Sequence, residues 1–314
     1  MATAPPAKAE ISAPFPNPSN AVARTGFGKL WETLFGTGGL LGSTGNVADA
    51  RAALGIGSTI SGRQRLINGS FAVNQRAVSG SVVLAAGVYG HDRWKAGASG
   101  CSYTFATTAG VTTLTITAGS LVQVVEDRNI EAGAHVASWT GTATARLNNS
   151  GAYAATPVSG TLTGGASAYL EFSTGTLSNV QLEPGTVATA VERRSYAAEL
   201  ALCQRYFTTS YDSVAAGTAA AAANRRVAVS TSSTTPGVQF QVSYPVTMRA
   251  APTITFYNPS TGAAGTMRNE TAGTDLAIGT FGTPGKDFFA AFNSAAAATV
   301  QNIYAMHFTA NAEL

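Results

Sequence analysis

Residues 112–119, TTLTITAG, decide the fold class. Leu114 and Ile116 fall on one face of an extended chain, and threonines separate them. The next stretch, LVQVVEDRNIEAG (121–133), opens with the same alternation of apolar and polar side chains. A period of two residues is the pattern of a half-buried strand, so we expect β-sheet here.

Segments of similar character surround these two stretches, with turns of Gly, Asn, Ser and Thr between them. Those nearby are VVLAAGVYG (82–90), HVASWTGTATARL (135–147), SAYLEFSTG (167–175) and LSNVQLEPG (177–185). A later group comprises VAVSTSS (227–233), GVQFQVSYPVTM (237–248), PTITFYNPS (252–260), DLAIGTFG (275–282), DFFAAFNS (287–294) and TVQNIYAMHFTANAEL (299–314). Strands that recur every ~8–12 residues predict antiparallel β-sandwiches of the jelly-roll type.

These patterns divide the chain into four expected parts. Residues 1–62 are an extended, proline-rich arm with short helices, and residues 63–194 are a jelly-roll β-sandwich. A linker helix follows over 195–205, SYAAELALCQR, with Ser195 as its cap. Residues 206–314 form a second β-sandwich. We expect the alanine tracts of this part to be loop and strand.

Two short helices are expected in the arm. The first, FGKLWETLF, carries one apolar stripe, made of Phe27, Leu30, Trp31, Leu34 and Phe35. The second covers about 47–54, with Asn46 as its cap and Gly55 at its end. Nine residues are too few for an isolated helix, so the first helix needs a surface to pack on. Docking on a partner chain is favoured over docking on its own globular part.

The composition indicates a folded chain with a sparsely charged surface. Hydrophobic residues make up 45% and charged residues 11%, where about 25% charged is usual. A net charge of +3 over 314 residues gives no basic footprint for nucleic acid. Cys101 and Cys203 suit neither a metal motif nor a disulfide framework, so we expect buried free thiols, with a single bridge as the alternative. The start, MATAPPAKAE, lacks the pattern of a secretory signal, and no apolar run suggests membrane insertion.

A glycosidase needs two carboxylates about 5–10 Å apart, so the carboxylates are the first candidates for catalysis. The candidates are Glu126, Asp127, Glu131, Glu171 and Glu183. Adjacent residues on a strand point to opposite faces, which separates the first two. We interpret all five as solvated carboxylates in turns.

Other chemistry has even less support in the sequence. The three histidines, His91, His135 and His307, stand in separate contexts without the spacing of a metal site. A turn hydrogen bond is favoured over a charge relay for His91 and Asp92, since no serine motif accompanies them. The expectation is therefore a protein that is not an enzyme and has no cofactor or metal.

Aromatic and turn residues are the remaining candidates for binding. Trp94 and Trp139 could stack on sugar rings, but their large apolar area favours a place in the core. Turn residues on a rigid sheet are better placed to meet a ligand. The binding candidates are Tyr257, Asn258, Arg268, Phe281 and Lys286.

Three groups of residues resemble the tail-fibre proteins of tailed bacteriophages. VADARAALGIG (47–57) looks like a segment that precedes the fibre domains of such proteins. RLINGSFAVNQRA (65–77), YGHDRWKAG (89–97) and VQLEPGTVATAVERRSYAAELALCQRYF (180–207) are similar to the opening and close of a jelly-roll module likened to carbohydrate-binding domains. VSYPVTMRAAPTITFYNPSTG (242–262) and MHFTANAEL (306–314) look like a terminal β-domain.

The resemblance implies a homotrimer that attaches the virion to its host. The N-terminal part would bind a tail or baseplate protein, and the second sandwich would be the tip that binds a host surface glycan or protein receptor. The chain would be made in the host cytoplasm and work extracellularly in the virion tail. The stretch between Trp94 and Trp139 is shorter than the family pattern, and the resemblance transfers no catalytic residue. The alternatives are a structural connector without receptor binding and a polysaccharide depolymerase.

A substitution in the first helix tests the docking role of the arm. The Trp31→Ala variant should lose incorporation into phage particles, because it removes the largest ring of the apolar stripe. Particle-bound and free chain would be quantified after centrifugation, with circular dichroism to check that the β-domains stay folded. Incorporation equal to that of the unaltered chain would reject the docking role.

Overall fold

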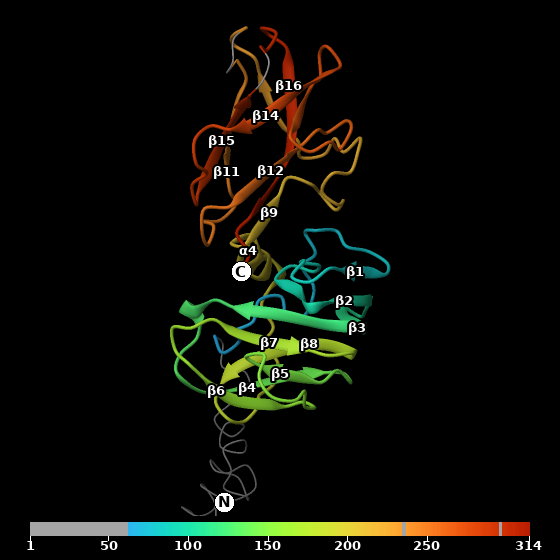
Figure 1. Ribbon diagram of the computed structural model, residues 1–314, viewed down its shortest axis with the longest axis vertical. Coiled ribbons are helices and arrows are strands. Elements are labelled where there is room, and N and C mark those ends of the chain that lie inside the picture. The colour runs from blue at the N-terminus through green and yellow to red at the C-terminus, as the bar shows by residue number, and fades with distance from the viewer. Residues whose placement is uncertain (1–61, 234–236, 295–296) are drawn as a thin grey trace, which may run out of the picture. The chain divides into compact units, whose positions relative to one another are not determined.

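The computed structural model describes residues 62–233, 237–294 and 297–314. The expected arm, its two helices and the apolar stripe from Phe27 to Phe35 lie outside these residues. Within them, the chain is mostly β, with antiparallel sheets packed as a β-sandwich and one short helix, which confirms the predicted fold class (Figure 1). No helix in this part is long and apolar enough to cross a membrane.

The chain forms two compact units, one of which holds all the described strands and the helix. This larger unit comprises residues 64–188 and 193–314. In the smaller unit, residues 1–63 with 189–192, the backbone N–H groups of Gly62 and Arg63 donate to the Glu192 carboxylate at 2.7 and 2.9 Å. Both sheets lie in the larger unit, so their division into separate domains stays a prediction.

The first sheet has eight antiparallel strands. They are β1 (Val82–Leu84), β2 (Trp94–Thr108), β3 (Val111–Val125), β4 (Gly133–Thr140), β5 (Ala145–Leu147), β6 (Val158–Leu162), β7 (Ala168–Phe172) and β8 (Gly175–Pro184), with a single 3₁₀ turn, Asp127–Asn129, after β3. One edge of β3 pairs with β2, and the other pairs with β8 over 114–116 and with β7 over 121–125. The long strand β3 is therefore shared by the two layers of the first sandwich.

Several strand predictions need correction, since β6 was not predicted and residues 135–147, expected as one strand, contribute to both β4 and β5. The stretches 112–119 and 121–133 were expected as two strands, but β3 runs through both. Gly119 sits at the supposed break with φ +70°, and a Cβ there would lie 2.0 Å from the Gly100 carbonyl oxygen. The register between β2 and β3 shifts at this point, so the glycines mark a β-bulge and not a turn. Because of the same bulge, the first half of β2 contains glycines and has the composition of a loop. For this reason β2 was not predicted.

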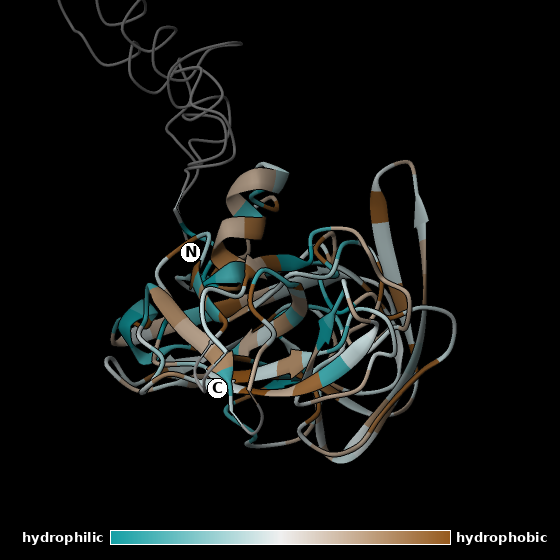
Figure 2. Cartoon of the chain, turned by 90° about the horizontal axis from the view of Figure 1, so that it is seen from above, coloured by the Kyte–Doolittle hydropathy of each residue, from teal (hydrophilic) through white to brown (hydrophobic). Residues whose placement is uncertain are grey.

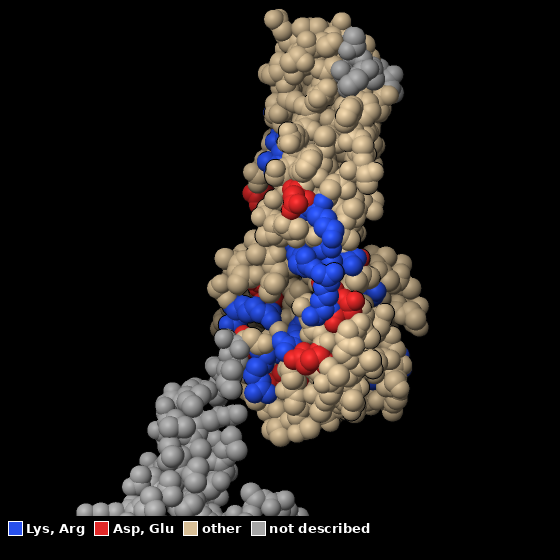
Figure 3. All heavy atoms as spheres, turned by 90° about the vertical axis from the view of Figure 1, so that its left-hand side faces the viewer, with Lys and Arg blue, Asp and Glu red and all other residues tan. Residues whose placement is uncertain are grey.

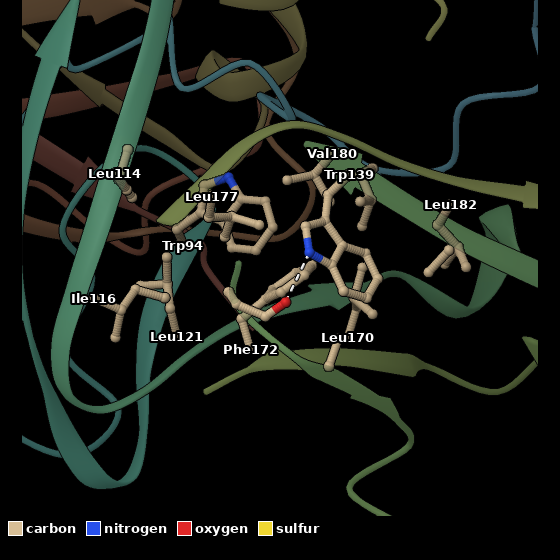
Figure 4. Packing of buried hydrophobic residues seen from close by; sticks show 14 of the residues in the cluster. Trp94, Leu114, Ile116, Leu121, Trp139, Leu170, Phe172, Leu177, Val180 and Leu182 are labelled. Atoms are coloured by element: carbon tan, nitrogen blue, oxygen red, sulfur yellow. Dashed lines mark hydrogen bonds between the residues drawn. The ribbon is translucent and has the colours of Figure 1, made fainter. Parts of the chain in front are cut away.

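The core of the first sandwich centres on Phe172 between two tryptophans (Figure 4). Its ring lies 6.0 Å from that of Trp94 and 5.0 Å, edge to face, from that of Trp139. The Trp139 indole N–H donates to the Ala143 carbonyl at 2.9 Å, drawn as the dashed line. Both tryptophans are buried, which confirms their predicted place in the core.

The single helix, α4 (Tyr196–Gln204), connects the two sheets. The Ser195 hydroxyl caps it by accepting a hydrogen bond from the Ala198 N–H at 3.3 Å. At the other end, the Arg205 N–H donates to the Ala201 carbonyl at 3.2 Å. The helix predicted over 195–205 is confirmed.

The second sheet also has eight antiparallel strands. They are β9 (Phe207–Thr209), β10 (Arg226–Val229), β11 (Gln239–Ser243), β12 (Thr253–Tyr257), β13 (Thr266–Asn269), β14 (Thr274–Thr280), β15 (Phe288–Asn293) and β16 (Ile303–Asn311). The last strand, β16, pairs with β10 and β13 in its first half and with β9 and β12 in its second half. Seven consecutive residues of β16, 304–310, are buried, so this strand runs through the middle of the second sandwich.

Figure 2 colours the chain by hydropathy and shows apolar and polar segments following one another along strands that face the viewer. In β11 the alternation is complete, with Phe240 and Val242 buried and their neighbours exposed. The alanine tract 215–224 is a loop, as expected. Cys101 and Cys203 are free and buried, which confirms the predicted thiols and excludes a bridge between them; burial raises the pKa of Cys101 to about 12.

Buried charges join the two sandwiches. Arg93 is 1% exposed and forms an ion pair with Glu313. Its guanidinium also donates a hydrogen bond to the Val124 carbonyl at 2.7 Å and lies 3.6 Å from the centre of the Tyr206 ring. We call the set Arg76, Asp92, Arg93 and Glu313 the ionic junction.

Arg76 completes the ionic junction. Its guanidinium lies 3.2 Å from Glu313 and 3.4 Å from Asp92, and it stacks 3.8 Å from the centre of the Phe207 ring. Asp92 also accepts hydrogen bonds from Gln75, at 2.6 Å from its backbone N–H and 2.8 Å from its side chain. Each charge of the junction thus has at least one opposite charge, and Asp92 and Arg93 also have hydrogen bonds to neutral groups. These contacts offset the cost of burial.

Replacing one charge of the junction should weaken folding strongly. The Glu313→Gln variant should lose about 3–5 kcal/mol of unfolding free energy, because Arg93 stays buried without its carboxylate. The matched control is Glu131→Gln, which breaks the more exposed pair with Arg65 and should cost no more than about 1 kcal/mol. Urea unfolding measures both. Equal losses of unfolding free energy in the two variants would show that the ionic junction stabilises the fold no more than an exposed ion pair does.

Candidate binding site

A row of four side chains crosses one face of the first sheet. In the register of the strands, Lys95 of β2 lies opposite Val122 of β3, Val122 opposite Glu171 of β7, and Glu171 opposite Arg146 of β5. Paired residues of neighbouring strands point to the same face of a sheet. The neighbouring row, Ala96, Leu121, Phe172 and Ala145, points the other way and is buried in the core.

The row of four forms the floor and sides of a hollow of about 360 Å³. Val122 and Gly97 give it an apolar floor, and Asn149 and Tyr169 also line it. Gly97 is required here by close packing, since a Cβ on it would lie 2.0 Å from the Ser120 hydroxyl and 3.0 Å from Glu171. We call this feature the sheet hollow.

Glu171 is the best-held side chain of the sheet hollow. The residue is 5% exposed, and its carboxylate accepts hydrogen bonds from the Ser120 hydroxyl at 2.6 Å and from Arg146 Nε at 2.7 Å. Burial alone would raise the pKa of Glu171, but the hydrogen bonds from Ser120, Arg146 and Tyr153 outweigh it and lower the pKa below its ordinary value of 4.5. The carboxylate is therefore ionised at neutral pH and serves as a fixed anchor for Arg146.

Four further polar side chains, Lys95, Arg146, Asn149 and Tyr169, line the sheet hollow. The Arg146 guanidinium lies 4.7 Å from the centre of the Tyr153 ring, which fixes its plane. Lys95 donates from Nζ to the Leu314 backbone oxygen at 2.8 Å. Within the described residues, the side chains of Asn149 and Tyr169 make no hydrogen bond, so their polar atoms are open to a ligand. An apolar floor with few, oriented polar groups is the usual make-up of a small-molecule site.

Three of the five carboxylates considered for catalysis are less exposed than expected. Glu126, Glu171 and Glu183 are buried, so their interpretation as solvated turn residues is wrong, whereas Asp127 and Glu131 are exposed as expected. Glu171 is the one carboxylate among the described residues that line the sheet hollow, and its oxygens are already bound. The two-carboxylate geometry of a glycosidase is thus not built around this hollow.

The histidines have structural partners. The His91 ring contacts the Tyr103 hydroxyl at 3.0 Å, while the neighbouring Asp92 belongs to the ionic junction, so the two form no relay. His307 lies between the Ser210 hydroxyl, 2.9 Å from Nδ1, and the Ala221 carbonyl, 2.8 Å from Nε2. In residues 62–233, 237–294 and 297–314, no group of three His, Cys, Asp or Glu could hold a metal ion.

The five predicted binding residues have separate surroundings in the second sandwich. Tyr257 ends β12 and packs edge to face on Tyr211, and Asn258 is fully buried. The Asn258 side-chain oxygen accepts hydrogen bonds from two backbone N–H groups of the following turn, at 2.9 and 3.2 Å. Asn258 is therefore a turn-forming residue with no surface to offer a ligand.

The other three predicted residues lie on β13 and in the turn between β14 and β15. Arg268 pairs with Asp275 across β13 and β14 at 2.9 Å. Phe281 is 61% exposed, and Lys286 is exposed nearby in the same turn. Lys95, Arg146 and Tyr169 were not among the predicted site residues. The strands of Arg146 and Tyr169 were predicted, but β2, which carries Lys95, was not, and neither was the pairing that puts the three side by side.

No protein-family model matches the chain, and a search of the curated proteins finds no match.

The lowered pKa of Glu171 predicts how its contribution to stability depends on pH. A carboxyl whose pKa is lower in the folded than in the unfolded state stabilises the fold above its ordinary value of 4.5, and this contribution disappears as the pH falls through the folded value. The difference in unfolding free energy between the unaltered chain and the Glu171→Gln variant should therefore be largest near pH 6–7 and shrink in acid. Urea unfolding across the pH range measures it. A difference that stays constant, or grows in acid, would contradict the assignment.

Proposed function

We propose that the chain is a receptor-binding subunit of a bacteriophage tail fibre, which attaches the virion to host surface glycans. The first sandwich would be the jelly-roll, carbohydrate-binding-like module to which residues 65–77, 89–97 and 180–207 are similar. The observation that carries the proposal is the sheet hollow, because it combines an apolar floor with open amide and phenol groups on a rigid sheet. The chain would work as a homotrimer in the virion tail, held to a tail or baseplate protein through its N-terminal part.

Weak single sites suffice for this function. A shallow sugar site of millimolar affinity corresponds to about −4 kcal/mol. Three copies in one fibre and several fibres in one particle raise the overall affinity by roughly 10²- to 10⁴-fold without any new contact. Glu171 and Arg146 of the sheet hollow are held by hydrogen bonds between strands, so these two side chains lose little conformational freedom on binding.

A bacterial glycan array tests the proposal. The fluorescently labelled full chain should bind a subset of surface oligosaccharides, and Arg146→Met and Tyr169→Ala should each weaken that binding about tenfold, equivalent to about 1.4 kcal/mol. Arg65→Met is the matched control, since it also breaks a surface Arg–Glu pair but lies outside the sheet hollow, and it should bind like the unaltered chain. The absence of glycan binding by the unaltered chain would overturn the proposed function.

A further inference from the structure

The outer face of β11, β15 and the turn before β15 carries exposed aromatic rings. In the register of β11 and β15, Ser243 lies opposite Phe288, Gln241 opposite Ala290, and Gln239 opposite Phe292. The alternate residues of the same strands, Phe240, Val242, Phe289 and Ala291, form the core beneath. The three pairs therefore share the outward face of the sheet.

Phe281 extends this face from the turn. Its backbone N–H donates to the Ala290 carbonyl at 2.8 Å, and its ring meets that of Phe292 edge to face at 5.7 Å. Gly279 lies opposite Phe292 on β14 and contributes no side chain beside that ring. Phe281 is 61% and Phe288 48% exposed. We call Gln239, Gln241, Ser243, Phe281, Phe288 and Phe292 the aromatic face.

The aromatic face is uncharged. None of its six residues is ionisable. The charged residues closest to it in sequence, Lys286 and Asp287, lie in the adjoining turn, where Asp287 accepts a hydrogen bond from the Thr247 hydroxyl at 2.6 Å. Figure 3, which looks at the side where β11 and β15 lie in Figure 1, shows few charged residues over the upper part of the chain. Charged partners, such as acidic polymers, thus find no complementary group on this face.

The polar groups of the aromatic face are open. Among the described residues, the side chains of Gln239, Gln241 and Ser243 are exposed and make no hydrogen bond. Each amide offers one acceptor and two donors. A protein partner that covered these amides would have to supply a hydrogen bond for each of them. A hydroxyl-rich, uncharged ligand with apolar C–H faces matches both kinds of group, since its hydroxyls pair with amides and its C–H faces stack on rings.

We infer that the aromatic face is a second glycan-binding surface, specific for uncharged saccharides. Phe281 and Phe288 stack on sugar rings, and Gln239 and Gln241 bind their hydroxyl groups. This surface rests on the proposed attachment function but is separate from the sheet hollow: its residues come from the second sheet, and those of the hollow from the first. Two sugar surfaces on each chain double the valency of a fibre.

Binding of the full chain to an array of uncharged and acidic bacterial oligosaccharides tests the inference. The double variant Phe281→Leu, Phe288→Leu keeps apolar bulk but removes the rings, and it should lose at least tenfold in affinity for uncharged oligosaccharides. The double variant Phe281→Tyr, Phe288→Tyr keeps the rings and should bind within about twofold of the unaltered chain. The control Val227→Ala, Val229→Ala changes exposed residues of β10 and should leave binding unchanged.

The outcomes separate this inference from the proposed function. Equal binding by the Leu and Tyr double variants overturns the aromatic face as a glycan site and leaves the proposed function standing. The same conclusion follows if Arg146→Met weakens glycan binding and the Leu double variant does not. Loss of oligomeric mass in the Leu double variant by light scattering, with unchanged glycan binding, assigns the face to a second copy of the chain and also overturns it. Failure of the unaltered chain to bind any oligosaccharide overturns both.

Discussion

The ion pair between Arg93 and Glu313 is the contact on which the arrangement of the two sandwiches depends. Arg93 immediately precedes β2, next to the core residue Trp94, and Glu313 follows β16, the strand that runs through the second sandwich. A guanidinium does not lose its proton inside a protein, so a buried arginine requires a carboxylate in a defined position. Arg76 and the Tyr206 ring complete that position from two further directions. An opposite charge at any other place would leave Arg93 buried and unpaired.

The ionic junction also bears on the surfaces that we assign to ligand binding. Lys95, two residues after Arg93, forms one side of the sheet hollow and donates to the backbone of Leu314, next to Glu313. Residues 92–97 thus run from the junction directly into the strand that forms one side of the hollow, and movement at one would disturb the other. A rigid binding surface loses less conformational entropy when a ligand binds, which matters most where each site is weak.

Local patterns in the sequence predicted the fold class, helix α4 and the core position of both tryptophans, because alternation and capping act over a few residues. The sequence did not predict β2, whose glycines serve a bulge that only the partner strand reveals. Nor did it predict the sheet hollow or the junction. Arg146 and Glu171 are 25 residues apart in the chain, and Arg93 and Glu313 are 220 apart. Glu126 and Glu171, interpreted as solvated, are buried because arginines and hydroxyl groups from distant parts of the chain bind them. Phe281 was predicted as a binding residue because it lies in a turn. Which residues of β11 and β15 lie beside it depends on the strand register, which the sequence does not show.

A fibre that holds many weak sites gains from units that do not bend or unfold separately. The ionic junction supplies that coupling if the two sandwiches form one cooperative unit. Differential scanning calorimetry of the full chain measures this most directly. We expect a single transition for the two sandwiches, with the calorimetric enthalpy equal to the van't Hoff enthalpy. Two resolved transitions, one for each sandwich, would contradict a junction that couples them.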